Sequence, residues 1–280
     1  MPEKIGLSDP ILLVGCGKMG GALLAGWLDQ GVPTDQILVV EPAIDAERSR
    51  IPGGISVLKD AADIADDFEP AVVIFAVKPQ VMGEVVPLYD RFTAAGTVFM
   101  SIAAGTPIRF FEDNLGVGAG VGRVMPNTPA LVGAGVSALF ANNRVTEAQC
   151  GLAENIMLAV GTTVWVKDES LMDIITAVSG SGPAYFFYLM EALEQAGIDG
   201  GLKPDIARLL TLETALGAAR LALEADDPPL ELRRRVTSPG GTTEAAICVL
   251  DEEGTAGTIK RAINAARERS SELAKTLRNN

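Results

Sequence analysis

The chain has 280 residues, a length that corresponds to about two domains of ordinary size. Its 36 acidic residues outnumber its 23 basic residues, giving a formal net charge of −13, which argues against a nucleic acid or an anionic membrane as partner. Histidine is absent, which excludes a Ser-His-Asp hydrolase, a histidine acid or base, and any histidine-ligated metal. No metal site is expected, whereas a small anionic substrate would need only a few local donors.

The first half of the chain alternates short apolar runs with helical patterns. Such near-continuous runs of Val, Ile, Leu and Ala are typical of strands buried on both faces. The predicted strands are Ile11–Val14, Ile37–Val40, Ile55–Leu58, Ala71–Val77, Thr97–Ile102, Gly118–Val124, Gly135–Phe140 and Thr162–Val166. Helices are predicted over Met19–Gln30 and Thr146–Ala159, the second opening with a Thr-x-x-Gln capping box. This alternation predicts a doubly wound α/β domain around a parallel sheet.

The second half carries helical patterns without further strand signals. The predicted helices are Glu169–Val178, Ala184–Ala196, Pro204–Ala225, Pro239–Leu250 and Thr258–Leu277. Gly197 is expected to end a helix, Pro204 to open one, and Ser238 to cap another ahead of Pro239. The helix from Pro204 is apolar around most of its circumference, which suits either a partner subunit or the centre of a monomeric bundle.

A glycine-rich segment follows the first predicted strand and opens the first helix. Gly15, Gly17 and Gly20 match the dinucleotide-binding fingerprint. The first glycine permits a tight turn, the second a close approach of backbone to pyrophosphate, and the third close packing of helix on strand. Lys18 and Met19 lie at the helix N-terminus that would face the phosphates. The segment therefore predicts a dinucleotide site formed by all five residues.

An acidic residue ends the second predicted strand. Glu41 lies where a carboxylate accepts hydrogen bonds from the ribose hydroxyls of NAD and repels a 2′-phosphate. It therefore favours NADH over NADPH, although a solvated loop glutamate is an alternative reading. Arg48 and Arg50 lie further on and are candidate clamps for a 2′-phosphate.

Two later loops follow strands whose carboxyl ends are expected at the same sheet edge. Open α/β sheets bind ligands at this edge. The predicted cofactor contacts are Ala76, Val77, Lys78 and Pro79 in the first loop, and Ala103 and Ala104 in the second. The small residues of the second loop would let a flat ring or a sugar approach, and Lys78 is read as a ligand contact rather than a surface charge.

The three cysteines, Cys16, Cys150 and Cys248, are far apart and form no CxxC pair. This pattern indicates neither a zinc site nor a disulfide framework, and it favours a reducing cytoplasm. No apolar run reaches the ~18 residues of a membrane span, and no signal peptide is expected.

Five motifs in order give the chain a family resemblance. They are the glycine-rich segment 15–20, the AVKPQ segment 76–80, RVMPNTP at 123–129, SGSGPAY at 179–185 and VTSPGGTT at 236–243. Over about residues 10–275 the chain resembles pyrroline-5-carboxylate reductase. The SPGGTT segment is the most specific of these motifs.

The resemblance implies an enzyme that transfers hydride from NADH or NADPH to C5 of L-Δ¹-pyrroline-5-carboxylate. The product is L-proline, formed in the last step of proline biosynthesis. The implied organisation is a Rossmann domain over residues 1–166 and an all-α dimerisation and substrate-binding domain over residues 167–280. Family members form dimers, often in rings of five dimers, with the active site between a Rossmann domain and helices of both subunits. The oligomer size, proline feedback and use of other cyclic imines stay open.

The SPGGTT segment is expected to open a helix, where free backbone N–H groups and the helix dipole attract a carboxylate. The expected substrate contacts are Ser238, Gly240, Gly241, Thr242 and Thr243. By the resemblance, Thr243 is the catalytic threonine that hydrogen-bonds the ring nitrogen. An ordinary capped helix is the alternative reading of the same turn.

Two features depart from the family pattern. Glu213 stands where many relatives have glutamine, and its charge calls for a partner such as Arg208 or Arg220. The basic run Arg233–Arg235 precedes the SPGGTT segment and is expected to attract either the anionic substrate or the cofactor pyrophosphate, with Arg235 the best placed of the three. A solvated helix face is the other reading of this run.

Two rival functions fit the sequence less well than the reductase. A lysine-dependent hydroxyacid dehydrogenase would need a lysine where Phe186 stands, and a nucleotide-binding sensor would need no substrate turn. The missing histidine also fits the reductase, because a cyclic imine that binds already protonated needs no side chain to deliver a proton. Catalysis would then come mainly from positioning.

Overall fold

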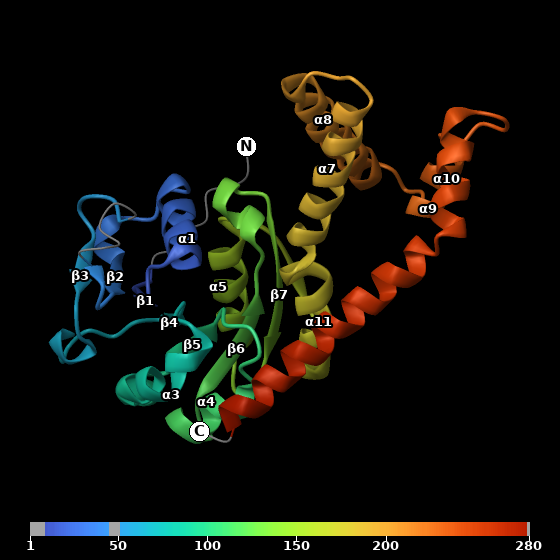
Figure 1. Cartoon of the computed structure of the whole chain (residues 1–280). Coiled ribbons are helices and arrows are strands. Elements are labelled where there is room, and N and C mark those ends of the chain that lie inside the picture. Colours follow the sequence, from blue (N-terminus) through green and yellow to red (C-terminus); the bar gives the residue numbers. More distant parts are fainter. Residues whose placement is uncertain (1–8, 45–50, 279–280) are drawn as a thin grey trace. The chain divides into compact units, whose positions relative to one another are not determined.

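The computed structural model describes residues 9–44 and 51–278, and in these residues one sheet has eight strands in the order β3-β2-β1-β4-β5-β6-β7-β8 (Figure 1). The strands are β1 (Ile11–Val14), β2 (Ile37–Val40), β3 (Ser56–Leu58), β4 (Val72–Phe75), β5 (Val98–Ser101), β6 (Gly120–Met125), β7 (Gly135–Ala141) and β8 (Gly161–Trp165). All eight predicted strands are confirmed to within a few residues. The sheet is not wholly parallel, because β7 runs antiparallel to β6 and β8 runs parallel to β7.

The carboxyl ends of five neighbouring strands stand in one row. Val14 of β1 pairs with Val40 of β2 on one side and with Phe75 of β4 on the other. Ser101 of β5 in turn pairs with Phe75 and with Arg123 of β6. The chain order reverses between β1 and β4, the switch point at which open α/β sheets bind ligands. The loops that leave these strands therefore start side by side at one edge.

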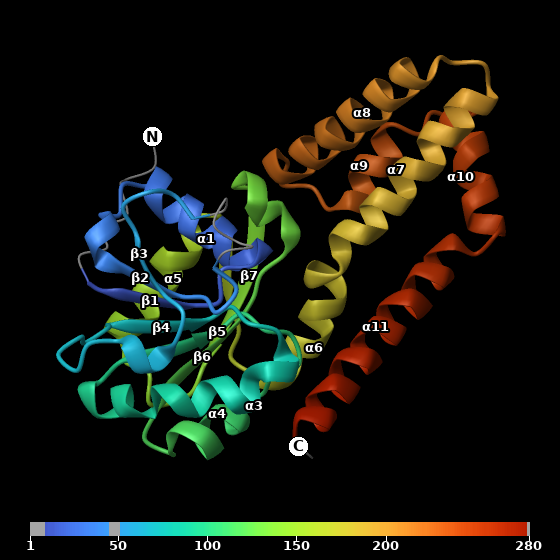
Figure 2. The same ribbon diagram turned by 60° about the vertical axis from the view of Figure 1, so that its left-hand side comes forward.

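Helices cover both faces of the sheet, as Figures 1 and 2 show. They are α1 (Lys18–Asp29), α3 (Met82–Val85), α4 (Ile108–Leu115), α5 (Glu147–Leu158) and α6 (Met172–Ile175), with the 3₁₀ turns η1 (Thr34–Gln36), η3 (Ala61–Asp63), η4 (Pro79–Val81), η5 (Val86–Ala95), η6 (Thr128–Val132) and η7 (Glu169–Leu171) and the π turn η8 (Thr176–Gly180). One core lies under α1 and α5, where the indole N–H of Trp27 donates to the carbonyl of Ile156 at 3.0 Å. The other lies under α3, η5 and α4, where the ring of Phe75 stacks on that of Phe111. The capping box that opens α5 is confirmed.

The chain divides into two compact units. The sheet unit comprises residues 1–181 and 266–280, and the helical unit comprises residues 182–265. By this division the sheet unit continues past the boundary expected after residue 166. The helices are α7 (Gly182–Asp199), α8 (Pro204–Glu224), α9 (Pro229–Arg235), α10 (Thr242–Glu252) and α11 (Thr255–Arg278), of which α11 passes from the helical unit into the sheet unit.

Helix boundaries in this region correct three expectations. Pro204 opens α8 as predicted, but α7 continues through Gly197 to Asp199. Helix α9, which begins at Pro229, was not predicted. Helix α10 begins at Thr242 with Gly241 as its cap, so Ser238 is not the N-cap.

The helical unit leaves large apolar side chains exposed. In α8 only Ala207 and Thr211 are buried, while Leu209 and Leu210 are 60% and 53% exposed. The reading of α8 as the centre of a monomeric bundle is therefore wrong for the described chain. In the described residues no helix combines the length and apolar character needed to span a membrane.

Candidate functional site

The glycine-rich loop has the geometry that a dinucleotide requires. Gly15 has φ +88°, and a Cβ on it would come within 2.7 Å of Val77 Cγ1. A Cβ on Gly20 would collide with the carbonyl oxygen of Gly15, so the start of α1 packs directly on the turn. Gly17 caps α1, and a Cβ on it would meet nothing within 4 Å. Two glycines are thus needed for close packing, and the third faces open space where phosphates would lie.

Glu41 lies beside this loop rather than in solvent. Its Oε2 accepts the backbone N–H of Cys16 at 2.7 Å, and its Oε1 accepts the backbone N–H of Ala43 at 2.9 Å. The residue is only 9% exposed, so the alternative of a solvated loop glutamate is wrong. The carboxylate ties the end of β2 to the glycine-rich loop and retains lone pairs for a ribose hydroxyl. Arg48 and Arg50 lie outside the described residues.

The other predicted cofactor loops start at the same edge. Val77 contacts the Gly15 turn as described, and Pro79 opens η4. Lys78, like Lys18, is exposed and therefore available to a ligand. Ala103 and Ala104 follow β5, and both are half-buried.

The predicted residues of the sheet unit therefore gather around one row of strand ends. They are Gly15, Gly17, Lys18, Met19, Gly20, Glu41, Ala76, Val77, Lys78, Pro79, Ala103 and Ala104. Arg235, also predicted to hold the cofactor, belongs to the helical unit together with the SPGGTT turn.

The SPGGTT segment forms a tight turn ahead of α10. Gly240 has φ +71°, and the N–H of Gly241 donates to the carbonyl of Ser238 at 3.0 Å. Thr242 and Thr243 occupy the first helical positions, where backbone N–H groups have no partner inside the helix. Both threonines are exposed. The turn thus presents free donors and hydroxyl groups on one surface, as an anion site requires.

A carboxylate of the chain already binds this turn. Glu244 Oε2 accepts the backbone N–H of Gly240 at 2.7 Å. Glu244 is the third residue of α10, from which a glutamate side chain reaches back to the N-terminal turn as in a capping box. The sequence analysis missed Glu244, although its spacing from the glycines is the signal that would have found it.

The basic run before the turn is largely neutralised by its own surroundings. Arg235 pairs with Asp227 at 2.6 Å and Arg234 with Glu231 at 2.6 Å, at the end of α9. Arg233 lies 4.0 Å from Asp251. These exposed pairs are weak, so an incoming anion can displace the carboxylates. Within the described residues Glu213 makes no ion pair with Arg208 or Arg220, and it is exposed.

Asn127, in the RVMPNTP motif, joins segments of the sheet unit. Its Oδ1 accepts the backbone N–H of Val136 at 2.9 Å, and its Nδ2 donates to the carbonyl of Ser179 at 3.3 Å. The RVMPNTP and SGSGPAY motifs are thus held together by one amide.

Among the described residues, three groups have displaced pKa values. Burial raises the pKa of the Tyr89 hydroxyl far above its usual range, and the nearby Asp60 carboxylate adds to the shift. Burial also raises the pKa of Cys150, with Glu147 and Glu154 contributing. The backbone N–H of Ser170 lowers the pKa of Asp168, whose side chain caps η7.

Two family models match the chain. Residues 169–273 match the family described as pyrroline-5-carboxylate reductase dimerisation. Residues 10–105, which contain the glycine-rich loop, match the family described as NADP oxidoreductase, coenzyme F420-dependent.

Full-length relatives agree with these matches. The chain is 45% identical to a pyrroline-5-carboxylate reductase of Pseudomonas aeruginosa, over 97% of this chain and 99% of that protein. A solved reductase structure from Coxiella burnetii is 38% identical and superposes with a TM-score of 0.87, covering 95% of this chain and 99% of that one. A Plasmodium falciparum pyrroline carboxylate reductase solved with NADP bound is 27% identical, with a TM-score of 0.84 over 95% of this chain and 98% of that one.

Proposed function

Because this chain belongs to the pyrroline-5-carboxylate reductase family and is an NAD(P)H-dependent oxidoreductase of proline biosynthesis, we propose a division of labour between its two units. The sheet unit holds the nicotinamide cofactor, and the turn before α10 holds pyrroline-5-carboxylate. The observation that carries this assignment is the row of strand ends around Gly15, next to which the predicted cofactor residues gather.

The cofactor fits the sheet unit on structural grounds. A Cβ would be blocked at Gly15 and Gly20 and free at Gly17, which is the pattern expected where a pyrophosphate replaces a side chain. Backbone N–H groups at the start of α1 would bind the phosphates, and the loop with Ala103 and Ala104 would pack on the ring. The cofactor, when bound, supplies a hydride.

The substrate carboxylate would bind the backbone N–H groups of Thr242 and its neighbours. The bond between Glu244 and Gly240 supports this assignment, because it shows that the turn accommodates a carboxylate oxygen at 2.7 Å. Ser238, Gly240 and Gly241 shape the turn, and the small glycines leave room for the ring.

Thr243 would hydrogen-bond the ring nitrogen and hold C5 of the imine toward the cofactor. Its hydroxyl is exposed on the first turn of α10, so it is available to a ligand. A substrate imine that enters protonated makes C5 electrophilic, and no enzyme acid is then required. The enzyme's contribution is orientation of the ring and neutralisation of the carboxylate.

Within the NAD(P)H dependence, we infer a preference for NADH. Glu41 places a buried carboxylate beside the loop that would hold the adenosine ribose, and a 2′-phosphate there would meet like charge. Arg235 is a further candidate for the cofactor, since its partner Asp227 is displaceable.

The helical unit lies within the region that matches the dimerisation family, and the chain self-associates through it. We propose a dimer, with a ring of five dimers as the larger assembly. A cytoplasmic location remains the expectation from the sequence.

The test follows NADH oxidation with pyrroline-5-carboxylate, for the wild type and for Thr243→Val. Loss of one hydrogen bond made to the reacting substrate should lower kcat/KM by about 100-fold while the Kd for NADH stays unchanged. Thr162→Val, at an exposed site on β8, is the matched control. A folded wild type without turnover would refute the function, and a change in NADH affinity alone would refute the role of Thr243.

The pH dependence gives a second test of the mechanism. The value of kcat/KM should fall as pH rises and the free imine loses its proton. A profile governed by an enzyme group near neutrality would contradict this scheme.

A further inference from the structure

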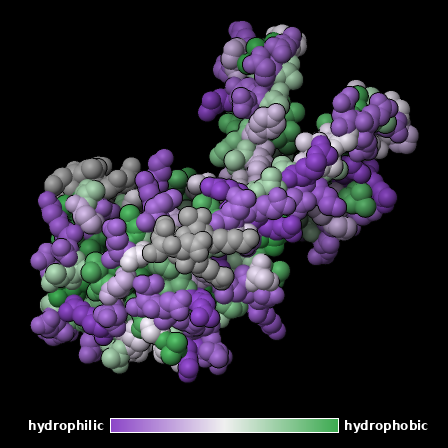
Figure 3. All heavy atoms as spheres, turned by 60° about the horizontal axis from the view of Figure 1, so that its bottom comes forward, coloured by the Kyte–Doolittle hydropathy of each residue, from purple (hydrophilic) through white to green (hydrophobic). Residues whose placement is uncertain are grey.

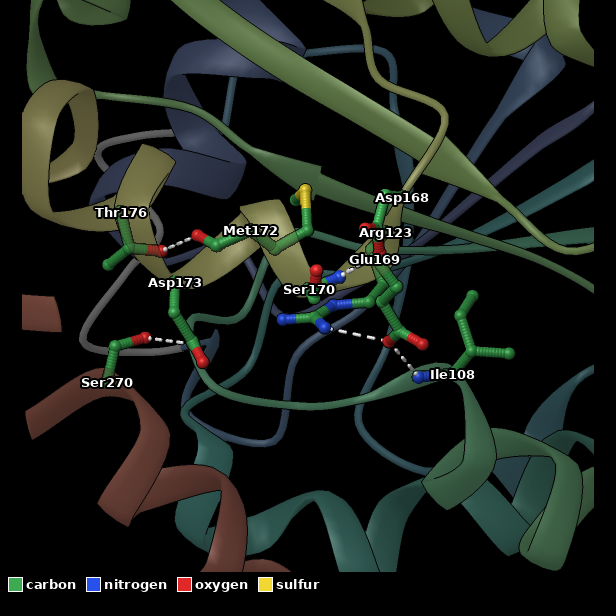
Figure 4. Close-up of polar contacts among 9 residues, drawn as sticks. All are labelled: Ile108, Arg123, Asp168, Glu169, Ser170, Met172, Asp173, Thr176 and Ser270. Carbon is green, nitrogen blue, oxygen red and sulfur yellow. Dashed lines mark hydrogen bonds and ion pairs between the residues drawn. The ribbon is translucent and has the colours of Figure 1, made fainter. Parts of the chain in front are cut away.

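A polar bridge lies behind the loop that follows β5 (Figure 4). Glu169 Oε1, in η7, accepts a hydrogen bond from Arg123 Nη1 at 2.7 Å. The same oxygen accepts the backbone N–H of Ile108, the first residue of α4, at 2.7 Å. One carboxylate oxygen therefore ties the end of β6 to the point where the loop after β5 enters α4.

A second contact holds α11, the helix that lies on Gly105 of this loop. Ser270, in the last part of α11, donates its hydroxyl to Asp173 Oδ1 at 2.7 Å (Figure 4). The backbone of α11 lies directly on Gly105, where a Cβ would come within 3.2 Å of Leu273 Cβ and 3.4 Å of the Ser270 carbonyl. Gly105 has φ +73°, so the loop combines a left-handed residue with a close approach. All these residues belong to the sheet unit.

The loop itself has little with which to hold its shape. Between Ser101 and Thr106 its side chains are small apart from Ile102, and the internal side-chain bond from Ala103 N–H to Ser101 Oγ is long, at 3.3 Å. The Ile102 N–H also donates to the Phe75 carbonyl at 3.1 Å, which holds the start of the loop to β4. The end of the loop is held from outside, by Glu169 and by the helix that Asp173 contacts.

The ion pair of this bridge is also largely shielded from water. The Arg123 side chain is 9% exposed and that of Glu169 is 31% exposed, so this ion pair is shielded from water far more than the surface pairs. Removing the partner of a buried guanidinium strongly destabilises the folded protein. Arg123 lies in the row of strand ends next to Ser101, so the pair is fixed in the same frame as the cofactor loops.

We propose that Glu169 and Asp173 are positioning residues that hold the loop 101–106 against the nicotinamide portion of the cofactor. The proposal rests on the proposed function of the sheet unit. The two residues lie four positions apart: Glu169 binds Ile108 just after the loop, and Asp173 binds the helix whose backbone lies on Gly105. The loop has no large polar side chain of its own. They act through the loop and do not touch the substrate.

The experiment measures the Kd for NADH and for NADPH by fluorescence, together with kcat and both KM values. Glu169→Met removes the acceptor and should raise both Kd values by about tenfold, with the ratio of the two unchanged, because the loop lies away from the 2′-position. Glu169→Gln keeps an acceptor oxygen and should restore affinity to within about threefold of the wild type. The KM for pyrroline-5-carboxylate at saturating cofactor should stay within about twofold.

Two further variants guard against simple unfolding. The double variant Arg123→Met/Glu169→Met removes both charges but still leaves the Ile108 N–H without its acceptor, and it should show the same rise in Kd. Ser270→Ala, which releases Asp173, should give a smaller rise of about threefold. Asp66→Asn is the matched control, since Asp66 pairs with Arg91 on the surface at 3.3 Å.

Folded variants that bind both nucleotides like the wild type would overturn the proposal. So would an equal loss in the control or a change in the NADH to NADPH ratio. Because nucleotide affinity is measured directly, this result is independent of turnover. A wild type that binds NADH but does not reduce pyrroline-5-carboxylate would refute the proposed function and leave the positioning test intact.

Discussion

The two units of this chain differ in how far they bury their apolar residues. In the sheet unit, strands such as β1 and β4 are fully buried, with side chains such as Leu12 and Phe75 at 0% exposure. In the helical unit, Phe186 and Tyr188 of α7 are 64% and 75% exposed, and Leu223 of α8 is 86% exposed. The predicted sites differ in the same way. The predicted cofactor residues belong to the unit with a buried core, and the predicted substrate turn belongs to the unit that leaves its apolar side chains exposed.

An apolar groove in the helical unit makes the contrast concrete. Its volume is about 460 Å³, and it lies between α7 and the first part of α11, with Tyr185, Leu189 and Ile259 among its lining residues. Hydrophobic residues are visible on the surface among hydrophilic ones in Figure 3. Exposed apolar surface of this kind is typical of a subunit interface. The sheet unit therefore completes its core within one chain, whereas the helical unit leaves apolar surface that a second copy of the chain would cover.

The largest effect is expected where packing and binding coincide, at Gly20. Gly20→Ala places a Cβ on the carbonyl of Gly15, which should cost about 1–3 kcal/mol of folding free energy and lower NADH affinity at least about 100-fold. Gly151→Ala in α5 is the control, because a Cβ there meets nothing within 4 Å and Ala favours the helix. Thermal unfolding measures the loss of stability, and nucleotide titration measures the loss of NADH affinity. Wild-type affinity in Gly20→Ala would show that the closed packing is not needed for the cofactor.

The next effect addresses the open unit. Leu189→Asp puts a charge into the apolar groove and should convert the assembly to monomers, with a loss of activity of more than about tenfold. Sedimentation velocity and the reductase assay report the two changes. Val117→Asp is the control, because Val117 is 75% exposed but belongs to the sheet unit. Monomers with full activity would contradict the view that the helical unit needs a partner.

A smaller effect is expected at Glu41. Glu41→Ser should shift the ratio of kcat/KM for NADH to that for NADPH by about tenfold toward NADPH, because a negative charge at the ribose is removed. The same variant should lower the melting temperature, since the N–H groups of Cys16 and Ala43 lose an acceptor. A lower melting temperature with an unchanged cofactor ratio would make Glu41 purely structural.

The smallest effect is a pH dependence at η7. The pKa of Asp168 is lowered by its bonds to Ser170, so the folded state favours the charged carboxylate. Its contribution to stability is present above the unfolded pKa of about 3.9 and is lost as pH falls through the lower folded value. Asp168→Asn should therefore melt slightly below the wild type at pH 7, and the gap should close near pH 2. A gap that persists in acid would mean that the cap does not depend on charge.

Much of the fold followed from the sequence. Unbroken apolar runs indicate buried strands, and all eight strands were predicted, as was the capping box at Thr146. The helix ends around Gly197 and Ser238 were misplaced, because a glycine inside α7 and a Ser-Pro pair ahead of the α10 turn obey local rules that the surrounding backbone overrides. The direction of β7 also escaped prediction, since an apolar run reads the same in both directions.

The candidate site shows the same division. The glycine-rich loop and the SPGGTT turn are contiguous motifs, so their residue types suffice to predict a ligand for each. The pairing of Arg123 with Glu169 was not predicted, because the two residues are 46 positions apart and the RVMPNTP motif, which Arg123 opens, does not reveal the partner.

The sequence by itself determined all eight strands, most of the helices and the family that the chain resembles, and it predicted which turns would hold phosphate and carboxylate. These properties depend on local periodicity and on glycine, whose permitted conformations are fixed by covalent geometry. Only the tertiary structure decided that Glu41 binds the glycine-rich loop and that Glu169 binds the backbone N–H of Ile108 at the start of α4. A carboxylate meets a backbone N–H only where the fold brings the two within about 3 Å, and spacing along the chain does not contain that distance for residues far apart.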